Sequence, residues 1–423
     1  MRSIIITSPV VEGKLTAVSA KADVQRALIA AALSEGKTDI SCLHPGKNIQ
    51  TTAACLRALG AAISYDKTDY TVTSAVCPGG FAALNTAESS TTLRFLLPII
   101  AALGGSAVID GSQHVKNQPI LPLIETLREH GAIIESDGLP LSVEGHLNEG
   151  DYRIPGNVSS QFISGLMFAL PLLGQNSRII LTAPLKSKSF TEMTIQTLST
   201  FHVHWKRTQE GFEMVPGSCY RTPGRYETAG DWSCAAPFLA AAAIGGRVEM
   251  DGLSLSTKQS ETKILSVLAE TGAAINMVGH HVTVEHVTDV RPFDADLSEC
   301  PDLVPTLAVL ACAAAGDSYL TGASHYKLKD IDRLEAVSEM LRALGAEIEN
   351  LPDGLLIHGT GRLKGGVVHA HGDHRIVMAA AQARSLSTGD ITVTEADAVS
   401  KAYPTFFIDY AALGGCVLEQ AEE

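Results

Sequence analysis

The amino-acid sequence predicts an α/β fold built from six units of about 70 residues. Two short patterns recur along the chain at nearly constant spacing, and each pattern occurs six times. Between them, apolar runs of helical length alternate with short strand-like segments. Such alternation is typical of α/β proteins, in which helices pack on sheets.

The first pattern is a helix-like segment that ends in a Gly-Ala turn and leads into a short strand. Clear copies are LRALGAAIS at Leu56, LREHGAIIE at Leu127, LAETGAAIN at Leu268 and LRALGAEIE at Leu341, with weaker copies at Leu198 and Ala411. The residues at the turn are 69 to 73 positions apart; they are Gly60, Gly131, His202, Gly272, Gly345 and Gly414. Regular spacing of this kind indicates an internal repeat.

The second pattern is a single glycine between an Ala/Leu-rich helix and a strand. These glycines are also 69 to 73 positions apart, at Gly36, Gly105, Gly174, Gly246, Gly316 and Gly389. We expect each of them to be a helix C-cap in the left-handed conformation, which costs glycine least. Each unit should therefore run helix, strand, helix, strand, with further strand-like segments after it.

The composition is that of a folded protein, and 423 residues are enough for two or three domains. Hydrophobic residues make up 45% of the chain and charged residues 18%, which excludes a disordered protein. The formal charge of −14 argues against nucleic acid or an anionic membrane as a partner. A local cationic pocket could still hold a small anionic substrate.

The eight cysteines show neither a CxxC pair nor the spacing of metal ligands, so we expect free thiols in a reducing compartment. The N-terminal stretch MRSIIITSPVVEGK lacks the apolar segment of a signal peptide. The longest apolar runs are too short to span a membrane. The sequence therefore predicts a cytoplasmic protein, and we expect neither a metal nor another cofactor.

Polar residues open the first predicted helix of each unit. They are Lys21 with Arg26, Ser89 and Ser90 with Arg94, Ser159 to Gln161, Asp231, Asp302, and Asp373 with Arg375. The loop before each second helix carries one lysine, at Lys47, Lys116, Lys188, Lys258, Lys329 and Lys401. Capping accounts for the Ser, Thr and Asp residues, and a solvated surface accounts for any single lysine. Cations gathered at several helix starts are instead typical of a phosphate or carboxylate site.

Seven stretches of the sequence carry a family resemblance. They are Lys21 with Arg26-Ala-Leu, GNVSSQFISGLM at Gly156, SKSFTEMT at Ser187, CPDLVPTLAVLA at Cys300, KLKDIDRL at Lys327, GDHRIVMAAA at Gly372 and SKAYPTFFIDY at Ser400. Over essentially its whole length the chain resembles the 5-enolpyruvylshikimate-3-phosphate (EPSP) synthase family, which consists of enolpyruvyl transferases.

The resemblance implies a two-domain inside-out α/β barrel built from six repeats of about 70 residues. Residues 20–229 would form the N-terminal three-repeat domain, and 1–19 with 230–423 the C-terminal one. The implied reaction transfers the enolpyruvyl group from phosphoenolpyruvate to the 5-hydroxyl of shikimate 3-phosphate and releases phosphate. This step belongs to the shikimate pathway of aromatic amino acid biosynthesis. We expect a monomer.

The resemblance also implies a role for individual residues. Shikimate 3-phosphate would be held by Lys21, Ala22, Arg26, Ser159, Ser160, Gln161, Ser187, Asp302 and Lys329. Phosphoenolpyruvate would be held by Lys21, Ser90, Gln118, Gln161, Arg333, Arg375 and Lys401. Asp302 would accept the hydroxyl proton, while Asp330 and Lys21 would handle the methylene proton and the developing charge.

Several positions depart from the family's pattern, among them Ile331 and Ala229, which stands where the family has the glutamate of its EGD. Ala22 replaces a serine, Ser90 a glycine, Phe190 a tyrosine, Gln118 an arginine and Asp330 a glutamate. Most of these changes fall on the phosphoenolpyruvate half. Two other functions therefore remain open: an enolpyruvyl transferase for a different anionic acceptor, and a catalytically weak paralogue that binds shikimate 3-phosphate or another anion.

Overall fold

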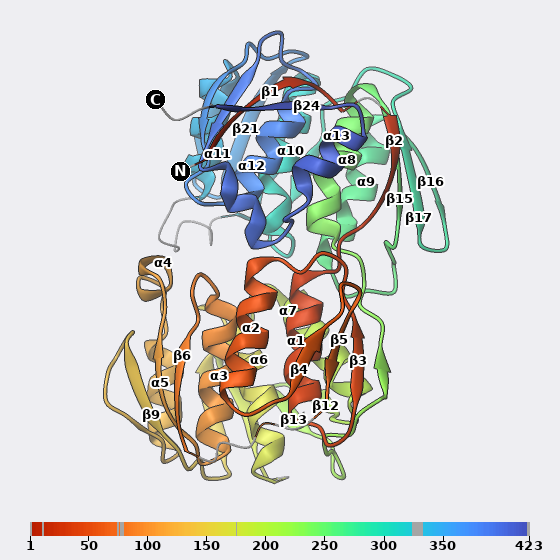
Figure 1. Ribbon diagram of the computed structural model, residues 1–423. Coiled ribbons are helices and arrows are strands. Elements are labelled where there is room, and N and C mark those ends of the chain that lie inside the picture. Colours follow the sequence, from red (N-terminus) through yellow and green to blue (C-terminus); the bar gives the residue numbers. More distant parts are fainter. Residues whose placement is uncertain are drawn as a thin grey trace. The chain divides into compact units, whose positions relative to one another are not determined.

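The structure is a computed structural model that describes residues 2–10, 12–73, 76, 80–174, 176–323 and 333–420. The chain divides into two compact units (Figure 1). Unit 1 comprises Met1–Val18 and Ala229–Glu423, and unit 2 comprises Ser19–Thr228. Helices and strands alternate along both units, which confirms the predicted α/β class.

Unit 1 holds three four-stranded sheets, each with one parallel pair followed by two antiparallel neighbours. The first joins β22 (Gly366–His369), β23 (Ile391–Thr394), β1 (Ser3–Ser8) and β24 (Cys416–Gln420). The second joins β2 (Glu12–Thr16), β15 (Arg247–Asp251), β17 (His281–Glu285) and β16 (Ala274–Val278), and the third β18 (Asp294–Asp296), β19 (Ala315–Thr321), β21 (Gly354–Thr360) and β20 (Glu347–Leu351). Because β1 lies between β23 and β24, both ends of the chain share one sheet.

Unit 2 also holds three four-stranded sheets with this pairing pattern. They are β14 (Arg225–Tyr226), β3 (Thr38–Ser41), β5 (Asp69–Val72) and β4 (Ile63–Tyr65); β6 (Phe81–Asn85), β7 (Ser106–Asp110), β9 (Leu141–Glu144) and β8 (Ile133–Ile134); and β10 (Asp151–Pro155), β11 (Arg178–Ala183), β13 (Gly211–Met214) and β12 (Trp205–Arg207). Within each sheet, buried and exposed residues tend to alternate, so one face packs on the helices.

The interior of unit 1 consists of three helices that contact one another, α8 (Trp232–Gly245), α10 (Val304–Ala313) and α12 (His374–Ala383). Their residues are almost all buried in one apolar core. Other helices connect the sheets: η2 (Ser260–Lys263), α9 (Ile264–Thr271), η3 (Pro301–Leu303), α11 (Arg333–Ala343), η5 (Ala396–Lys401) and α13 (Phe406–Ala412). Their ends bring polar residues to the starts of the core helices.

In unit 2 the apolar core lies around α1 (Lys21–Ala32), α3 (Ser90–Ala102), α6 (Ser160–Ala169) and α7 (Lys188–Thr200). Contacts run from α1 to α7, from α7 to α6 and from α6 to α3. The remaining helices are α2 (Lys47–Ala58), α4 (Gln113–Lys116), α5 (Leu121–Glu129) and η1 (Leu170–Leu172).

Four of the predicted helix starts have a side-chain cap. The side chains of Ser89, Ser159, Asp231 and Asp373 accept from the backbone N–H groups of Thr92, Gln161, Cys234 and Arg375, at 3.2, 3.3, 2.9 and 2.9 Å. The capping interpretation is therefore confirmed for these residues.

The prediction that the second set of glycines forms left-handed C-caps is wrong for most of them. Gly316 lies inside β19, and Gly36 lies four residues after α1 ends at Ala32, so neither is a helix C-cap. Gly36, Gly174 and Gly316 have positive φ, whereas Gly105, Gly246 and Gly389 do not. Gly246 ends α8 in an extended conformation, since the chain passes there directly into β15. The left-handed residues are instead the six at the Gly-Ala turn, including His202, with φ between 63° and 107°.

Gly165 lets α6 approach α3 closely. A Cβ atom at this position would lie 2.3 Å from the backbone oxygen of Arg94, far inside van der Waals contact. We expect Gly165→Ala to lower the free energy of unfolding by about 1–3 kcal/mol, because the helices must move apart. Urea denaturation measures this loss.

Gly245 provides a matched control in another helix. Apart from its chain neighbours and the backbone of its own helix, no atom of the described residues lies within 4 Å of a Cβ atom at this position, so Gly245→Ala should leave stability unchanged or raise it slightly. Equal midpoints for the two variants would contradict the steric argument at Gly165.

The seven cysteines that the structure describes are free thiols. No helix in the described ranges is long and apolar enough to cross a membrane.

Candidate active site

Unit 2 places several predicted site residues at the starts of α1 and α7. Lys21 is the first residue of α1 and Ala22 follows it, while Ser187 precedes α7 in a left-handed conformation with φ 51°. The N-cap residues of the two helices, Ala20 and Ser187, form no capping hydrogen bond with their side chains. The starts of these helices thus differ from those of α3 and α6, where the side chain of the N-cap serine accepts from a first-turn N–H group.

Arg26 is buried in unit 2, with 2% of its surface exposed. Its guanidinium donates to Thr194 Oγ1 at 2.8 Å, to the Ala22 oxygen at 2.7 Å and to the Phe190 oxygen at 3.0 Å. Burial lowers the pKa of Arg26 to about 10, although the neighbouring Asp23 opposes this shift. Arg26 thus ties α1 to α7 in this structure, and its contact with a substrate stays a prediction.

A hydrogen-bond network joins the starts of α3 and α6. Arg94 donates to Gln161 Oε1 at 2.7 Å and to Ser159 Oγ at 3.5 Å, and Gln161 donates to Thr91 Oγ1 at 2.9 Å. Ser160 begins α6 beside this network and is 8% exposed. Two residues that are predicted to bind substrate, Ser159 and Gln161, are thereby held in fixed orientations.

Arg94 is a site candidate that the sequence analysis did not assign. It lies four residues after Ser90 and hence about one helical turn into α3. Its guanidinium also donates to the Pro119 oxygen at 2.8 Å, next to Gln118. The signal in the sequence was a lone arginine near a predicted helix start, which is too weak to indicate these partners.

Gln118 follows the short helix α4 and lies 2.9 Å, Nε2 to Nε2, from His114. The nearby cation Lys116 is paired with Asp110 at 3.0 Å. The backbone N–H of Gly111 and the Lys116 ammonium together lower the pKa of the Asp110 carboxyl. Lys116 is therefore already engaged, which limits how well it could replace an arginine at position 118.

Unit 1 gathers carboxylates and guanidiniums at the starts of its core helices. Asp302 in η3 forms a very short ion pair with Arg375 in α12, and both side chains are mostly buried. Arg333 pairs with Asp373 at 3.1 Å, and Arg375 lies 3.7 Å from the same carboxylate. Burial raises the pKa of Asp373, but Arg333 and Arg375 outweigh it and hold that pKa well below its usual range.

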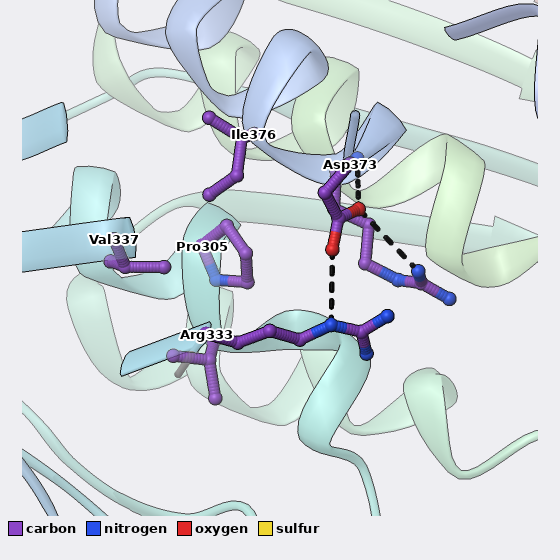
Figure 2. A pocket seen from close by; sticks show the side chains of 7 residues that line it. Pro305, Arg333, Val337, Asp373 and Ile376 are labelled. Atoms are coloured by element: carbon purple, nitrogen blue, oxygen red, sulfur yellow. Dashed lines mark hydrogen bonds and ion pairs between the residues drawn. The ribbon is translucent and has the colours of Figure 1, made fainter. Parts of the chain in front are cut away.

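A small pocket adjoins this cluster. Figure 2 shows the Arg333–Asp373 ion pair beside the apolar side chains of Pro305, Val337 and Ile376. The pocket thus offers guanidinium groups next to an apolar wall. This combination suits a small anion that carries a hydrocarbon group.

Lys401, at the end of η5, donates from Nζ to the Gly372 oxygen at 2.8 Å. Gly372 directly precedes Asp373, so the Lys401 ammonium lies near the start of α12. Of the predicted residues in unit 1, the structure thus brings Asp302, Arg333, Arg375 and Lys401 to the starts of neighbouring helices. Lys329 and Asp330 lie outside the described residues.

Glu261 was not predicted from the sequence as a site residue. It is 4% exposed, and its Oε1 atom has no hydrogen-bond partner in the described part of the chain. Burial and the negative charge of Asp302 raise the pKa of Glu261 to about 8. This shift favours the protonated form of its side chain in the folded protein.

This shift predicts a pH-dependent stability. The unfolded chain releases the Glu261 proton near its ordinary pKa of 4.5, whereas the folded chain keeps it up to about 8. Stability must then fall as pH rises through this window and level off above it, by at most about 1.4 kcal/mol per pH unit. Denaturation at pH 5 and pH 8 should show a fall of about 2–4 kcal/mol that Glu261→Gln removes.

The exposed Glu270 in α9 serves as the control, because Glu270→Gln should keep the wild-type pH dependence. Parallel pH profiles for wild type and Glu261→Gln would contradict the shifted pKa.

Comparison with known proteins identifies the family. Residues 6–409 match the family model described as EPSP synthase (3-phosphoshikimate 1-carboxyvinyltransferase). The chain is 33% identical over 420 residues to a 3-phosphoshikimate 1-carboxyvinyltransferase of Clostridium perfringens, covering 98% of this chain and 99% of the relative. It is also 33% identical over 423 residues to that of Methanocorpusculum labreanum, covering 99% and 100%.

Solved structures share the fold. An EPSP synthase from Acinetobacter baumannii matches with a TM-score of 0.85 at 22% identity, over the whole of both chains. The enolpyruvyl transferase NikO from Streptomyces tendae matches with a TM-score of 0.77 at 17% identity, over 100% of this chain and 99% of the other. With a family model that covers nearly all of the chain and relatives one-third identical over their full length, the chain belongs to the EPSP synthase family.

Proposed function

We propose that this protein is a 3-phosphoshikimate 1-carboxyvinyltransferase of the shikimate pathway. It transfers the enolpyruvyl group of phosphoenolpyruvate to the 5-hydroxyl of shikimate 3-phosphate and releases phosphate. Family membership over residues 6–409 is the observation that carries this proposal. The arginine and carboxylate cluster of unit 1 supports it, because the reaction needs both anion binding and proton transfer.

The reaction begins when the methylene carbon of phosphoenolpyruvate takes up a proton and the acceptor oxygen attacks the neighbouring cationic carbon. The acceptor hydroxyl loses its proton in this step, and a tetrahedral adduct forms. Phosphate then leaves as the new methyl group gives up a proton, which restores the double bond. Each half of the reaction thus needs a base and a stabilised anion.

We assign the proton-accepting role for the hydroxyl to Asp302, since its carboxylate lies in the cluster and pairs with Arg375. Arg333, Arg375 and Lys401 would hold phosphoenolpyruvate. Lys21 and Asp330 would transfer the methylene proton, and this assignment stays a prediction.

The remaining assigned residues would also hold the ligands. Ser159, Ser160, Gln161 and Ser187 all lie at helix starts, which favours contacts with the acceptor's phosphate and carboxylate. Ala22, Arg26 and Lys329 would complete the acceptor site, and Ser90, Gln118 and Gln161 the phosphoenolpyruvate site.

We further propose the inside-out barrel of six repeats, with three-repeat domains at 20–229 and at 1–19 with 230–423. The six four-stranded sheets with one pairing pattern support this arrangement. The cytoplasmic location and the monomeric state stay predictions.

A coupled phosphate-release assay tests the proposed function. Phosphate should appear only when shikimate 3-phosphate and phosphoenolpyruvate are both present, and omission of each in turn is the control. Binding of the acceptor without turnover would instead support a weak paralogue. Turnover with a different anionic hydroxyl compound alone would support another acceptor.

A further inference from the structure

Glu261 is fixed in position by the residues directly before it. The Gln259 side chain accepts from the Trp232 N–H at 3.0 Å and donates to the Gly230 oxygen at 2.8 Å, at the start of α8. Ser260 Oγ donates to the Glu299 oxygen at 2.7 Å, just before η3. These bonds hold η2 between the starts of two core helices, and the Glu261 carboxyl has no role in them.

The groups that face Glu261 are mostly acidic. Asp302 of η3 and Asp231 at the start of α8 both disfavour its ionised form, and Arg375 of α12 favours it. The nearby Cys300 thiol is protonated, because burial raises its pKa to about 12.

Lys263, the cation on the same short helix, instead donates to the Asp296 oxygen at 2.6 Å. A charge on Glu261 would therefore be only weakly compensated.

We propose that Glu261 is a positioning residue that, in its neutral form, keeps the Asp302–Arg375 pair suited to an anionic substrate. This inference rests on the proposed function, in which Arg375 holds phosphoenolpyruvate and Asp302 accepts a proton. The carboxyl is buried, its Oε1 atom is unpartnered in the described ranges, and it touches neither ligand in the proposed assignment.

Charge counting explains the effect of its ionisation. With Glu261 neutral, the cluster contains the carboxylates of Asp231, Asp302 and Asp373 and the guanidiniums of Arg333 and Arg375. Ionised Glu261 adds a fourth carboxylate within the same buried region. The added charge repels an anionic substrate and competes for Arg375, so substrate affinity should fall when Glu261 loses its proton.

The loss should follow the titration of a single group. A carboxyl with a pKa of about 8 is almost fully protonated at pH 7 and about one-tenth protonated at pH 9. We therefore expect kcat/KM for phosphoenolpyruvate to fall about tenfold between these pH values, mainly through KM.

The experiment measures kcat/KM for phosphoenolpyruvate at pH 7 and at pH 9 in variants of the full chain and compares the ratio of the two values. Glu261→Gln keeps the shape of the neutral acid and cannot ionise, so its ratio between pH 7 and pH 9 should be within about twofold of one. Glu261→Asp restores a titrating carboxyl and should restore the alkaline fall. Glu270→Gln, at an exposed position, should retain the tenfold fall of the wild type. Near-ultraviolet circular dichroism, which reports on buried Trp232, verifies that each variant is folded.

Infrared difference spectra between pH 7 and pH 9 provide a readout that does not need turnover. The wild type should lose a protonated-carboxyl band that Glu261→Gln lacks. An alkaline rise in KM that persists in Glu261→Gln, or a titrating band that persists in it, would overturn the proposal. If the enzyme does not turn over the two substrates, the proposed function fails; the infrared titration and the pH dependence of phosphoenolpyruvate binding then still decide the role of Glu261.

Discussion

Asp302→Asn is expected to lower kcat by about 10²- to 10⁴-fold while shikimate 3-phosphate still binds, because the amide cannot accept the hydroxyl proton. The structure sharpens this expectation. From the sequence alone, Asp302 after Pro301 could have been a helix cap, and asparagine caps equally well. The Asp302 carboxylate instead pairs with Arg375, and the N-cap residues of η3 and α10 are Cys300 and Leu303.

The measurement separates chemistry from binding. Single-turnover rates report the chemical step, and intrinsic fluorescence with increasing shikimate 3-phosphate reports acceptor affinity. Asp289→Asn, at an exposed position of the same unit, is the matched control and should match the wild type. Asparagine also weakens the pairing of Arg375, so KM for phosphoenolpyruvate should change as well. A variant that retains half of the wild-type kcat would exclude Asp302 as the proton acceptor.

Local patterns predicted much of the fold. Polar residues before apolar runs marked where α3, α6, α8 and α12 begin, since such residues cap helices. The Gly-Ala turns marked chain reversals that require positive φ. Even His202 adopts this conformation, which shows that the position within the unit, rather than the residue type, determines the backbone there.

Contacts between distant residues could not be predicted in the same way. Arg94 meets Gln161, which lies 67 positions later, and Arg26 meets Thr194, which lies 168 positions later. A single sequence contains no signal for such pairs. The sequence around Glu261 also gives the wrong impression of its burial, because the polar run STKQSETK is typical of an exposed loop. Only its packing between the starts of α8 and η3 reveals a buried acid.

Gln118→Arg is expected to lower KM for phosphoenolpyruvate by about 10- to 100-fold. An arginine that forms paired, charge-assisted hydrogen bonds with a small anion contributes about 1.5–3 kcal/mol, and a neutral amide does not replace it. The local structure indicates that no neighbouring lysine supplies the missing positive charge at this position. Lys116, two residues earlier, is occupied by Asp110 at 3.0 Å, and Gln118 itself bonds to His114.

Arg94 is the residue that could replace the missing arginine, in which case Gln118 would have no effect on phosphoenolpyruvate binding. Its guanidinium reaches the Pro119 oxygen beside position 118, but it also donates to Gln161 and Ser159 and lies over the Phe162 ring of α6. These bonds, together with 6% exposure, fix it as a support for α6. We therefore expect that Arg94 does not take over the missing contact.

Gln118→Lys separates charge from geometry in this test. A lysine restores one positive charge without the planar fork, so it should recover only a small part of the gain. Near-equal improvement by lysine and arginine would mean that net charge alone limits phosphoenolpyruvate binding. A KM that falls less than several-fold in Gln118→Arg would show that another cation already serves this position, and the altered residue 118 would then be without consequence for the reaction.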